Sequence, residues 1–312
     1  MPDSPFPHSP VPHSPLPRPL VVGIDVGGTK THLRACAGDE PIAERVRPSS
    51  GWRPRDPVAA ADWLCALTGE ALPPGARPSS VAVGAHGCET PLQCEEIRSV
   101  LQDRLGVPCL VVGDAELLVP AAGLDKGVGL VAGTGSVAVG RRPDGTLVQV
   151  GGWGAALGDE GGAAGLVREA ARAVWAAHDL GEAPDALAEG LMSAFGVSEV
   201  PALGAALEGA TDISAEWGRH APVIFEAAAS GSLIAGEVIA EGGRSLASLV
   251  VRLAKRGVPV DDVVISGGTI LAQPALHDAL LASLAILVPS ARLQPLRVPP
   301  VEGSVALARS LV

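Results

Sequence analysis

Three turns rich in glycine and hydroxyl side chains punctuate the sequence, and each follows a short apolar run. They read Gly27-Gly28-Thr29, Gly133-Thr134-Gly135-Ser136 and Ser266-Gly267-Gly268-Thr269. Glycine adds no Cβ and tolerates positive φ, so the backbone N–H groups and hydroxyls of such a turn can converge on an anion. A single turn of this kind is weak evidence, because β-hairpins use the same residues. Three of them predict a nucleoside triphosphate site, with the first two turns on the phosphates and the third on the nucleoside.

Carboxylates and a tryptophan stand close to these turns. Asp25 precedes the first turn, and Asp114 ends an apolar run. A second glycine-rich stretch holds Trp153 and Gly158 and leads into Asp159. A phosphate turn, carboxylates and an aromatic ring among glycines indicate a compact site for a polar ligand.

Each of these side chains also has a purely structural interpretation. Asp114 could be the N-cap of a helix. Asp159 and Glu160 would suit a helix N-terminus, where negative charge is stabilised by up to ~1 kcal/mol. Trp153 could belong to the core, and His86 could be a satisfied, partly buried histidine. The residue types alone leave these alternatives open.

The elements that must position the turns can be read from apolar periodicity. The order strand, turn, strand, strand, helix, strand, helix occurs twice, which predicts an α/β protein of two lobes with similar topology and a ligand cleft between them. The predicted strands include 20–26, 80–85, 108–112, 128–132, 145–150 and 262–265. The predicted helices include 53–72, 90–105, 114–123, 232–255 and 303–311.

Composition narrows the class of protein. With 312 residues and 47% apolar content, the chain can bury a large core and should form two domains. A net charge of −11 argues against nucleic acid or an anionic membrane as a partner. The proline-rich residues 1–19, with His8 and His13, are expected to be a disordered tail without a metal or a signal peptide. Five cysteines without a C-x-x-C pair favour a reducing cytoplasm over a disulfide frame or zinc site: Cys36, Cys65, Cys88, Cys94 and Cys109.

Longer motifs carry a resemblance to a known family across residues 20–312. They are GIDVGGTKT, VVGDAELLVPAAG, LVAGTGS, GGWGAALGDEGGAAG and PPVEGSVALA. The chain resembles the sugar kinase/hsp70/actin ATPase superfamily, and within it the N-acetylglucosamine kinase-like branch of the BadF/BadG/BcrA/BcrD ATPase type. This resemblance implies a two-lobed actin-like ATPase (ribonuclease H-like) fold. Its lobes would be 20–123 and 124–302, with the helix 303–312 packing back on the first.

The resemblance also implies an activity and roles for single residues. The chain would use ATP and Mg²⁺ to phosphorylate an amino sugar, N-acetylglucosamine first, at its 6-hydroxyl, as a cytoplasmic homodimer. Asp114 would accept the proton of the attacking hydroxyl, and Asp25 would lie beside Mg²⁺ and its waters. The residues assigned to the nucleotide and metal are Asp25, Gly27, Gly28, Thr29, Lys30, Gly133, Thr134, Gly135, Ser136, Gly267 and Gly268. The residues assigned to the sugar are His86, Gly87, Asp114, Thr134, Gly135, Trp153, Gly158 and Asp159.

One departure from the family's sequence pattern leaves the identity of the sugar open, and two other functions remain alternatives. The family commonly has an asparagine near a tryptophan after the third strand, where this chain reads PSSGW at 48–52. An ATPase activator of a radical dehydratase would need cysteines for an iron–sulfur cluster, but the second turn ends in Ser136 and no cysteine follows Cys109. Related sugar-sensing regulators carry a DNA-binding helix-turn-helix before the first turn, where only the tail is expected here. The alternative that stays open is a sensor that acts through a protein partner and binds sugar without consuming ATP.

Overall fold

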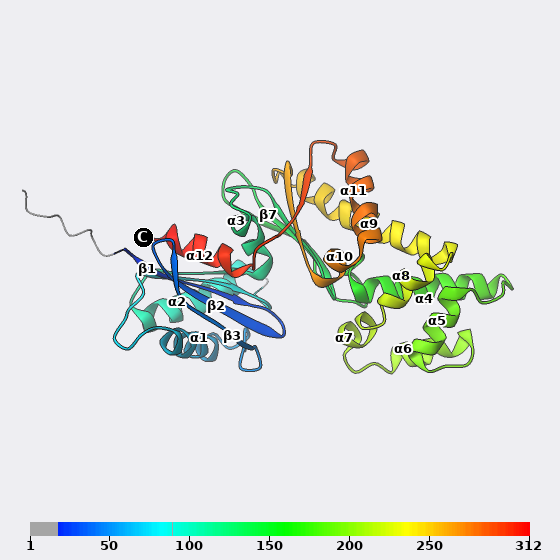
Figure 1. The fold of residues 1–312 in the computed structure, drawn as a ribbon, viewed down its shortest axis with the longest axis horizontal. Helices are drawn as coiled ribbons and strands as arrows, with labels where there is room; N and C mark the ends of the chain where they lie inside the picture. Colours follow the sequence, from blue (N-terminus) through cyan, green and yellow to red (C-terminus); the bar gives the residue numbers. More distant parts are fainter. Residues whose placement is uncertain (1–17, 89) are drawn as a thin grey trace, which may run out of the picture.

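Two five-stranded sheets form the centre of the computed structural model, which describes residues 18–88 and 90–312 (Figure 1). Most of the predicted tail therefore lies outside the described residues. The first sheet has the order β3-β2-β1-β4-β5, with β1 Leu20–Val26, β2 Lys30–Ala37, β3 Glu40–Pro48, β4 Ser80–Ala85 and β5 Cys109–Gly113. The second has the order β10-β9-β6-β7-β8, with β6 Val128–Ala132, β7 Ser136–Arg141, β8 Leu147–Gly151, β9 Asp262–Ser266 and β10 Arg292–Pro295.

Both sheets have the same strand order and the same strand directions. The first three strands of each sheet are antiparallel neighbours. The next strand, β4 or β9, pairs in parallel with the first, and the last strand, β5 or β10, pairs in parallel with that one. Parallel neighbours need a crossover, usually a helix, whereas antiparallel ones need only a short turn. This explains why strands precede helices in each half, and it confirms the predicted repeat and the α/β class.

Helices cover the two faces of the first sheet. The helices α1 (Pro57–Ala71) and α2 (Pro91–Leu105) pack together over one face. On the other face, α12 (Val301–Arg309) packs against β1, as the red helix beside the blue strands in Figure 1 shows. The Ser304 hydroxyl on α12 donates to the carbonyl of Ile24 at 2.8 Å. The last helix of the chain thereby fixes the strand that leads into the first glycine turn.

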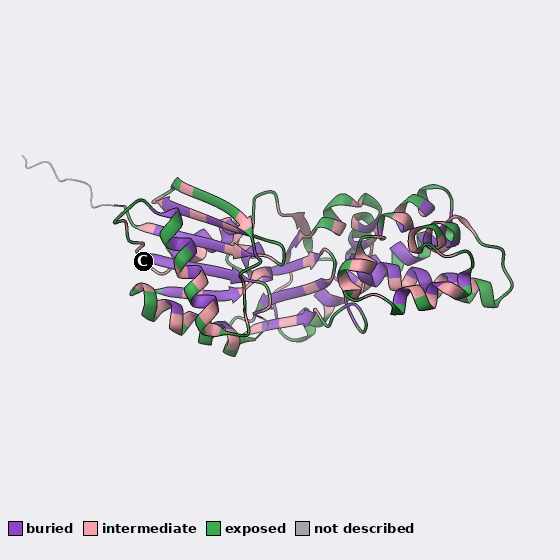
Figure 2. Ribbon diagram, turned by 90° about the horizontal axis from the view of Figure 1, so that it is seen from below, coloured by how far each residue is buried: buried purple, intermediate pink, exposed green. Residues whose placement is uncertain are grey.

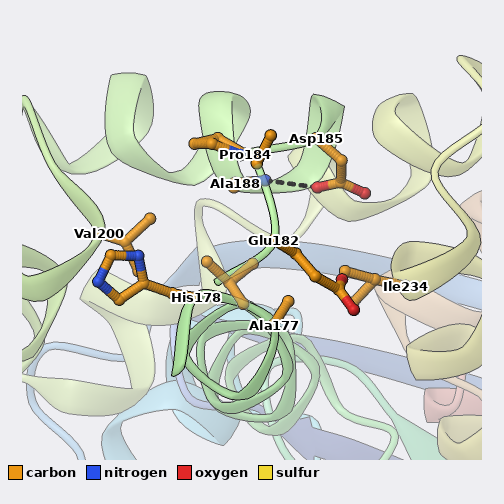
Figure 3. Close-up of a pocket in the computed structure, with 10 residues that line it drawn as sticks. Ala177, His178, Glu182, Pro184, Asp185, Ala188, Val200 and Ile234 are labelled. Carbon is orange, nitrogen blue, oxygen red and sulfur yellow. Dashed lines mark hydrogen bonds between the residues drawn. The ribbon is translucent and has the colours of Figure 1, made fainter. Parts of the chain in front are cut away.

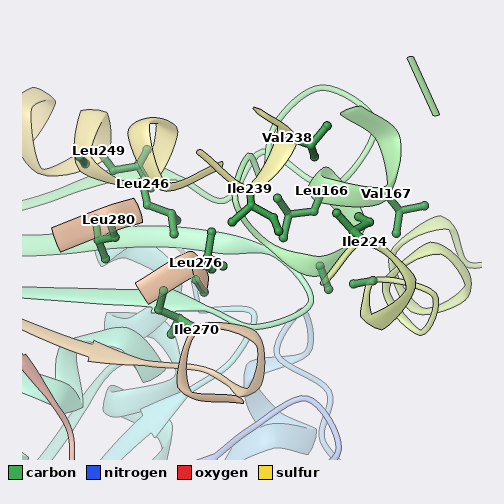
Figure 4. Close-up of a cluster of buried hydrophobic side chains, with 14 of the residues drawn as sticks. Leu166, Val167, Ile224, Val238, Ile239, Leu246, Leu249, Ile270, Leu276 and Leu280 are labelled. Atoms are coloured by element: carbon green, nitrogen blue, oxygen red, sulfur yellow. The ribbon is translucent and has the colours of Figure 1, made fainter. Parts of the chain in front are cut away.

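The second sheet carries most of the remaining helices. A large apolar core joins its strands to α4, α9 and α11 (Figure 4). Figure 2 shows most strands of the two sheets as largely buried, whereas β3 at the edge of the first sheet is largely exposed. The helices are α4 Ala163–Asp179, α5 Ala186–Phe195, η2 Val200–Ala202, α6 Leu203–Glu208, α7 Ile213–Gly218, α8 Pro222–Ala229, α9 Leu233–Lys255, α10 Gly268–Ala272 and α11 Pro274–Leu287.

Within 18–88 and 90–312, no single helix is long and apolar enough to cross a membrane. One pair, Ala186–Phe195 with Val200–Glu208, meets the criteria only when its two parts are combined across a 49° bend.

The two lobes meet at the segment that follows β5. This segment is the 3₁₀ turn η1 (Asp114–Leu117) and the short helix α3 (Leu118–Ala121). Ala115 and Leu118 are buried there in one apolar cluster with side chains of β7 and β9. A Cβ built on Gly129 of β6 would lie 2.5 Å from the Ala115 carbonyl oxygen, so only glycine allows this approach. The residue that begins η1, Asp114, is therefore held at the junction of the lobes.

Candidate active site

The carboxyl ends of three parallel strands bring Asp25, His86 and Asp114 to one edge of the first sheet. The strands β1, β4 and β5 are neighbours and run in the same direction. The backbone N–H of His86 donates to the Val26 carbonyl at 2.8 Å, which ties the end of β4 to the end of β1. His86 Nδ1 lies 3.6 Å from Asp114 Oδ2. Polar side chains of three separate segments thus form one group.

Asp25 is held in an environment that disfavours its charge. Its pKa is raised from 3.8 to about 7, mainly by burial and then by the neighbouring Asp114 carboxylate, while Lys30 opposes both effects. A divalent cation with hard oxygen preferences would relieve this strain, so the two carboxylates fit Mg²⁺. Among the residues that the structure describes, no group of three or more His, Cys, Asp or Glu side chains could hold a metal alone. Mg²⁺ itself keeps several waters and binds phosphate oxygens, so it needs few protein ligands.

Asp114 has one carboxylate oxygen engaged by the backbone and one directed at His86. Its Oδ1 accepts from the N–H of Ala115 at 2.8 Å. The helix N-cap interpretation is wrong, because Gly113 is the N-cap of η1 and Asp114 is its first residue. The local chain bends into a 3₁₀ turn rather than the single helix predicted over 114–123, since Glu116 turns back to accept from the Gly113 N–H at 3.1 Å.

The first glycine turn is open. Within it, the Gly27 N–H donates to the Lys30 carbonyl at 3.0 Å. Gly28, Thr29 and Lys30 are exposed. The ring of His86 lies beside it, 3.7 Å from where a Cβ of Gly28 would be. The expectation of a partly buried histidine is wrong, because 61% of the His86 side chain is exposed. The glycines add no side chain that would cover the turn next to His86. The Trp52 indole N–H donates to the His86 carbonyl at 2.8 Å and so fixes the backbone that carries His86.

The second glycine turn is locked from two sides. Within it, the Gly133 N–H donates to the Gly135 carbonyl at 3.0 Å. The start of α4 donates to it twice, from Ala163 N–H to the Gly133 carbonyl and from the next N–H to the Thr134 carbonyl. The Thr269 hydroxyl, from the third turn, also donates to the Gly133 carbonyl at 2.7 Å. The second and third turns thus form one unit at the carboxyl ends of β6 and β9.

The third turn allows a close backbone approach. Gly267 has a φ of 114°, and a Cβ there would lie 2.4 Å from the backbone of Ala132. Gly268 is exposed, with no atom within 4 Å of its Cβ position. A ligand can therefore reach the backbone of Gly268 without meeting a side chain.

Asp159 lies against the second turn. Its Oδ1 accepts from the Ser136 N–H at 3.4 Å, and a Cβ on Gly135 would lie 2.6 Å from its Oδ2. The residue is 7% exposed, and burial raises its pKa. The helix N-terminus interpretation of Asp159 and Glu160 is wrong, because α4 begins at Ala163 with Gly162 as its N-cap.

The loop before Asp159 presents apolar side chains to solvent. Trp153 is 76% exposed and Leu157 is 88% exposed, so the core interpretation of Trp153 is wrong. Gly158 permits the loop to fold under the tryptophan, since a Cβ on it would lie 2.9 Å from that of Trp153. Gly87, on the loop after β4, has a φ of 80° and abuts Pro54.

Two residues of this region carried no local signal in the sequence. Arg168 on α4 donates to the carbonyls of Ala155 and Gly158. Glu116 pairs with Arg141 of β7 across the lobe junction at 2.5 Å, with 8% of its side chain exposed. Both contacts depend on how distant segments pack, which residue type and spacing do not reveal.

A separate hollow lies between α4, α5 and α9 (Figure 3). Its volume of about 10 Å³ is close to the least that one water needs. His178, Glu182 and Asp185 line it, and none of the predicted site residues does. It has no room for a sugar or a nucleotide.

Comparison with known proteins agrees with this architecture. The profile of the BadF/BadG/BcrA/BcrD ATPase family matches residues 22–285. The chain belongs to this family. Its fold is shared with a solved structure from Chromobacterium violaceum, assigned as an N-acetylglucosamine kinase, at a TM-score of 0.69 and 24% identity over 93% of this chain and 99% of that one. A family-level prediction made from the motifs is therefore confirmed, and so is the two-lobed fold.

Two further relatives are more distant or match only in part. The N-acetylmuramic acid/N-acetylglucosamine kinase of Clostridium acetobutylicum is 31% identical over 153 residues, which are 45% of this chain and 48% of that relative. The match thus spans about half the length of the curated relative. A Streptomyces griseus ROK family glucokinase, solved with glucose and AMPPNP, has a TM-score of 0.54 at 18% identity over 94% of this chain and 99% of that one.

Proposed function

We propose that this ATPase-family protein is an ATP-dependent sugar kinase that phosphorylates an amino sugar, with N-acetylglucosamine as the first candidate and its 6-hydroxyl as the acceptor. The observation that carries the proposal is the group formed by Asp25, His86 and Asp114 at one sheet edge, beside an open glycine turn. A locked glycine turn with the Asp159 carboxylate against it supplies the other half of the site. Membership of the family and the kinases among its relatives support the same assignment.

Asp114 is the proposed base. Its side chain is 41% exposed, and Oδ2 is left over from the backbone hydrogen bond that Oδ1 accepts. The sugar hydroxyl would give its proton to Asp114 as its oxygen bonds to the γ-phosphorus, and the bond from that phosphorus to the β,γ-bridging oxygen would break to release ADP. Phosphoryl transfer relies mainly on positioning and charge neutralisation, so one aligned carboxylate is sufficient.

Asp25 and the first turn would hold the phosphates. The N–H groups of the exposed Gly28 and Thr29 would donate to phosphate oxygens, and Lys30 adds a positive charge. The Gly27 N–H donates to the Lys30 carbonyl, so Gly27 would serve the phosphates by shaping the turn. Mg²⁺, when bound, supplies a Lewis acid that neutralises charge on the transferring phosphoryl group. Asp25 is the residue that would hold it, through waters or directly, and the cation would favour the charged form of this carboxyl.

Asp159 and Trp153 would take the sugar. The buried Asp159 carboxylate can accept hydrogen bonds from sugar hydroxyls, and burial raises its pKa. The exposed ring of Trp153 offers an apolar face to the sugar's C–H groups. Gly133–Ser136 would then serve the phosphate and the sugar from one rigid turn.

The stretch 48–52 bears on how the acyl group of the sugar would be recognised. At 48–52, where the family commonly has an asparagine, Ser49 is buried and its hydroxyl pairs with Thr31 at 2.8 Å. A Cβ on Gly51 would lie 2.4 Å from Nε1 of Trp63, so a larger residue does not fit there. Neither Ser49 nor Gly51 can supply the side-chain amide that the family's asparagine would offer to the sugar. The sugar is therefore to be identified by comparing several candidates.

The test is a coupled assay of ADP release with N-acetylglucosamine, glucosamine, N-acetylmuramic acid, N-acetylmannosamine and glucose. Sugar-dependent ADP from at least one of them supports the kinase, and NMR of the product identifies the phosphorylated hydroxyl. No increase above the sugar-free rate with any sugar would contradict the proposal. A cytoplasmic homodimer is also proposed, and light scattering of the purified protein measures its mass.

A further inference from the structure

The backbone at Asp159 has an uncommon conformation. In the described part of the chain, residues 18–88 and 90–312, it is the one non-glycine residue with positive φ, at 58°. The left-handed region costs an L-residue roughly 1–2 kcal/mol. Such a conformation persists only where surrounding contacts enforce it, and it clusters at functional sites.

Arg168 makes contacts that can enforce it. This residue lies in the second turn of α4, and 15% of its side chain is exposed. Its Nη1 donates to the Gly158 carbonyl at 2.7 Å and also to the Ala155 carbonyl. Nε donates to Glu169 at 2.8 Å. A largely buried guanidinium is costly unless its donors are satisfied, and here backbone carbonyls of one loop satisfy them.

The held carbonyls belong to the segment that presents Asp159. The Gly158 carbonyl belongs to the planar peptide group that joins Gly158 to Asp159. A hydrogen bond that holds this carbonyl therefore also holds the orientation of the Asp159 N–H and Cα. On the other side, a Cβ on Gly165 would lie 2.2 Å from the Asp159 carbonyl oxygen, so α4 presses directly on this residue. The carboxylate has little freedom other than to face Gly135 and Ser136.

We propose that Arg168 is a positioning residue of the sugar site, which holds the loop 154–161 through two carbonyls so that the Asp159 carboxylate is preorganised for sugar hydroxyls. This inference rests on the proposed function for the identity of the ligand, but the hold on the loop is independent of it. Preorganisation matters because a misplacement of about 1 Å can cost on the order of 10²-fold in rate.

The same helix provides a matched control. Arg172 lies one turn further along α4 and pairs with Glu169 at 3.5 Å, but its side chain is 68% exposed. It shares the residue type, the helix and the acidic partner of Arg168, but the hydrogen bonds to the loop come from Arg168. Any effect of removing Arg168 that also follows from removing Arg172 is not an effect of loop positioning.

The kinetic test compares Arg168→Met, Arg168→Lys and Arg172→Met. We expect Arg168→Met to raise the KM for the sugar by about tenfold or more, while the KM for ATP stays within about twofold of wild type. Arg168→Lys should recover part of the loss, because an ammonium can still donate to a carbonyl. Arg172→Met should match wild type. Equal loss for sugar and ATP in Arg168→Met would overturn the positioning role.

A double-mutant cycle tests whether Arg168 acts through Asp159. If it does, Arg168→Met should raise the sugar KM much less in the Asp159→Asn background than in the wild-type background. The effects of two residues that act through one another are not additive. Full additivity of the two effects would contradict the inference.

Hydrogen exchange provides a readout that does not depend on activity. The N–H groups of Gly158 and Gly162 donate within this segment, at 2.8 and 2.9 Å to the carbonyls of Gly154 and Asp159. Their exchange should accelerate at least about tenfold in Arg168→Met and stay unchanged in Arg172→Met. Unchanged exchange in both variants would refute the hold on the loop. A wild-type protein that phosphorylates no sugar refutes the proposed function instead, and leaves the exchange result to decide on Arg168.

Discussion

The two lobes carry glycine turns of similar composition, yet the structure holds them very differently. The first, Gly27–Thr29, is tied by one hydrogen bond to the Lys30 carbonyl and one from the Ser49 N–H, and acidic side chains flank it. The second, Gly133–Ser136, receives donors from the start of α4 and from Thr269, and Asp159 fills the space next to Gly135. One turn is open and charged, and the other is closed in by protein.

This contrast suggests a division of labour. An open turn can adapt to phosphates and a cation that arrive together, and repulsion between Asp25 and Asp114 gives it a driving force to bind them. A locked turn can preorganise donors and acceptors for a neutral sugar, for which there is little electrostatic attraction. We therefore expect substitutions at the open turn and at the locked turn to change different measured properties of the protein.

The largest expected effect is on the open side, at Asp114. Asp114→Asn preserves size and still accepts from the Ala115 N–H but cannot take up a proton, so kcat should fall by at least ~10². ATP binding, measured by calorimetry, should persist. Asp103→Asn, an exposed carboxylate on α2, is the control and should be unchanged. Near wild-type turnover in Asp114→Asn would eliminate it as the base.

The next effect separates the two turns directly. Gly135→Ala puts a methyl group 2.6 Å from Asp159 Oδ2, and overpacking of this kind costs about 1–3 kcal/mol. We expect a lower melting temperature and weaker sugar binding. Gly28→Ala meets only the His86 ring at 3.7 Å and should melt like wild type.

Asp159→Gly in the Gly135→Ala background provides the control for that comparison. Removing the carboxylate should restore the melting temperature if the clash causes the loss. If Gly28→Ala and Gly135→Ala destabilise the protein equally, the two turns are not held differently.

The sequence predicted the strands well and the site only in part. The runs 20–26 and 80–85 match β1 and β4 in full, because strands buried on both faces read as nearly continuous apolar runs. The interpretation of Asp159 and Glu160 as a helix N-terminus was wrong by several residues, because α4 begins at Ala163. The backbone of Gly158–Gly162 follows contacts with Arg168 and Gly135 and not local preference. The pairing of Glu116 with Arg141 joins segments whose approach depends on the lobe junction. The ligand roles of the turn residues remain predictions.

A smaller effect tests the charge strain on the open side. The folded pKa of Asp25 is about 7 against an ordinary 3.8, so between these values the unfolded chain binds fewer protons and stability falls as pH rises. Asp25→Asn removes that penalty. At pH 8 without Mg²⁺ the variant should melt higher, by about 2–4 °C for each kcal/mol relieved.

The gain of Asp25→Asn should nearly vanish at pH 5, where the native carboxyl is already protonated. Thermal denaturation at both pH values measures it, and activity should be lost at either. A gain that is the same at pH 5 and pH 8 would show that the charge of Asp25 is not the cause.

The smallest expected effect concerns the rim of the locked side. Trp153→Ala should leave stability within about 0.5 kcal/mol of wild type, because the side chain is 76% exposed. If its ring packs on the sugar, the KM for the sugar should rise several-fold while the KM for ATP does not change. Leu157→Ala removes an 88% exposed side chain of the same loop and should change neither. Equal effects of both substitutions would mean that the loop contributes general apolar surface, and the preorganised part of the sugar site would then end at Asp159.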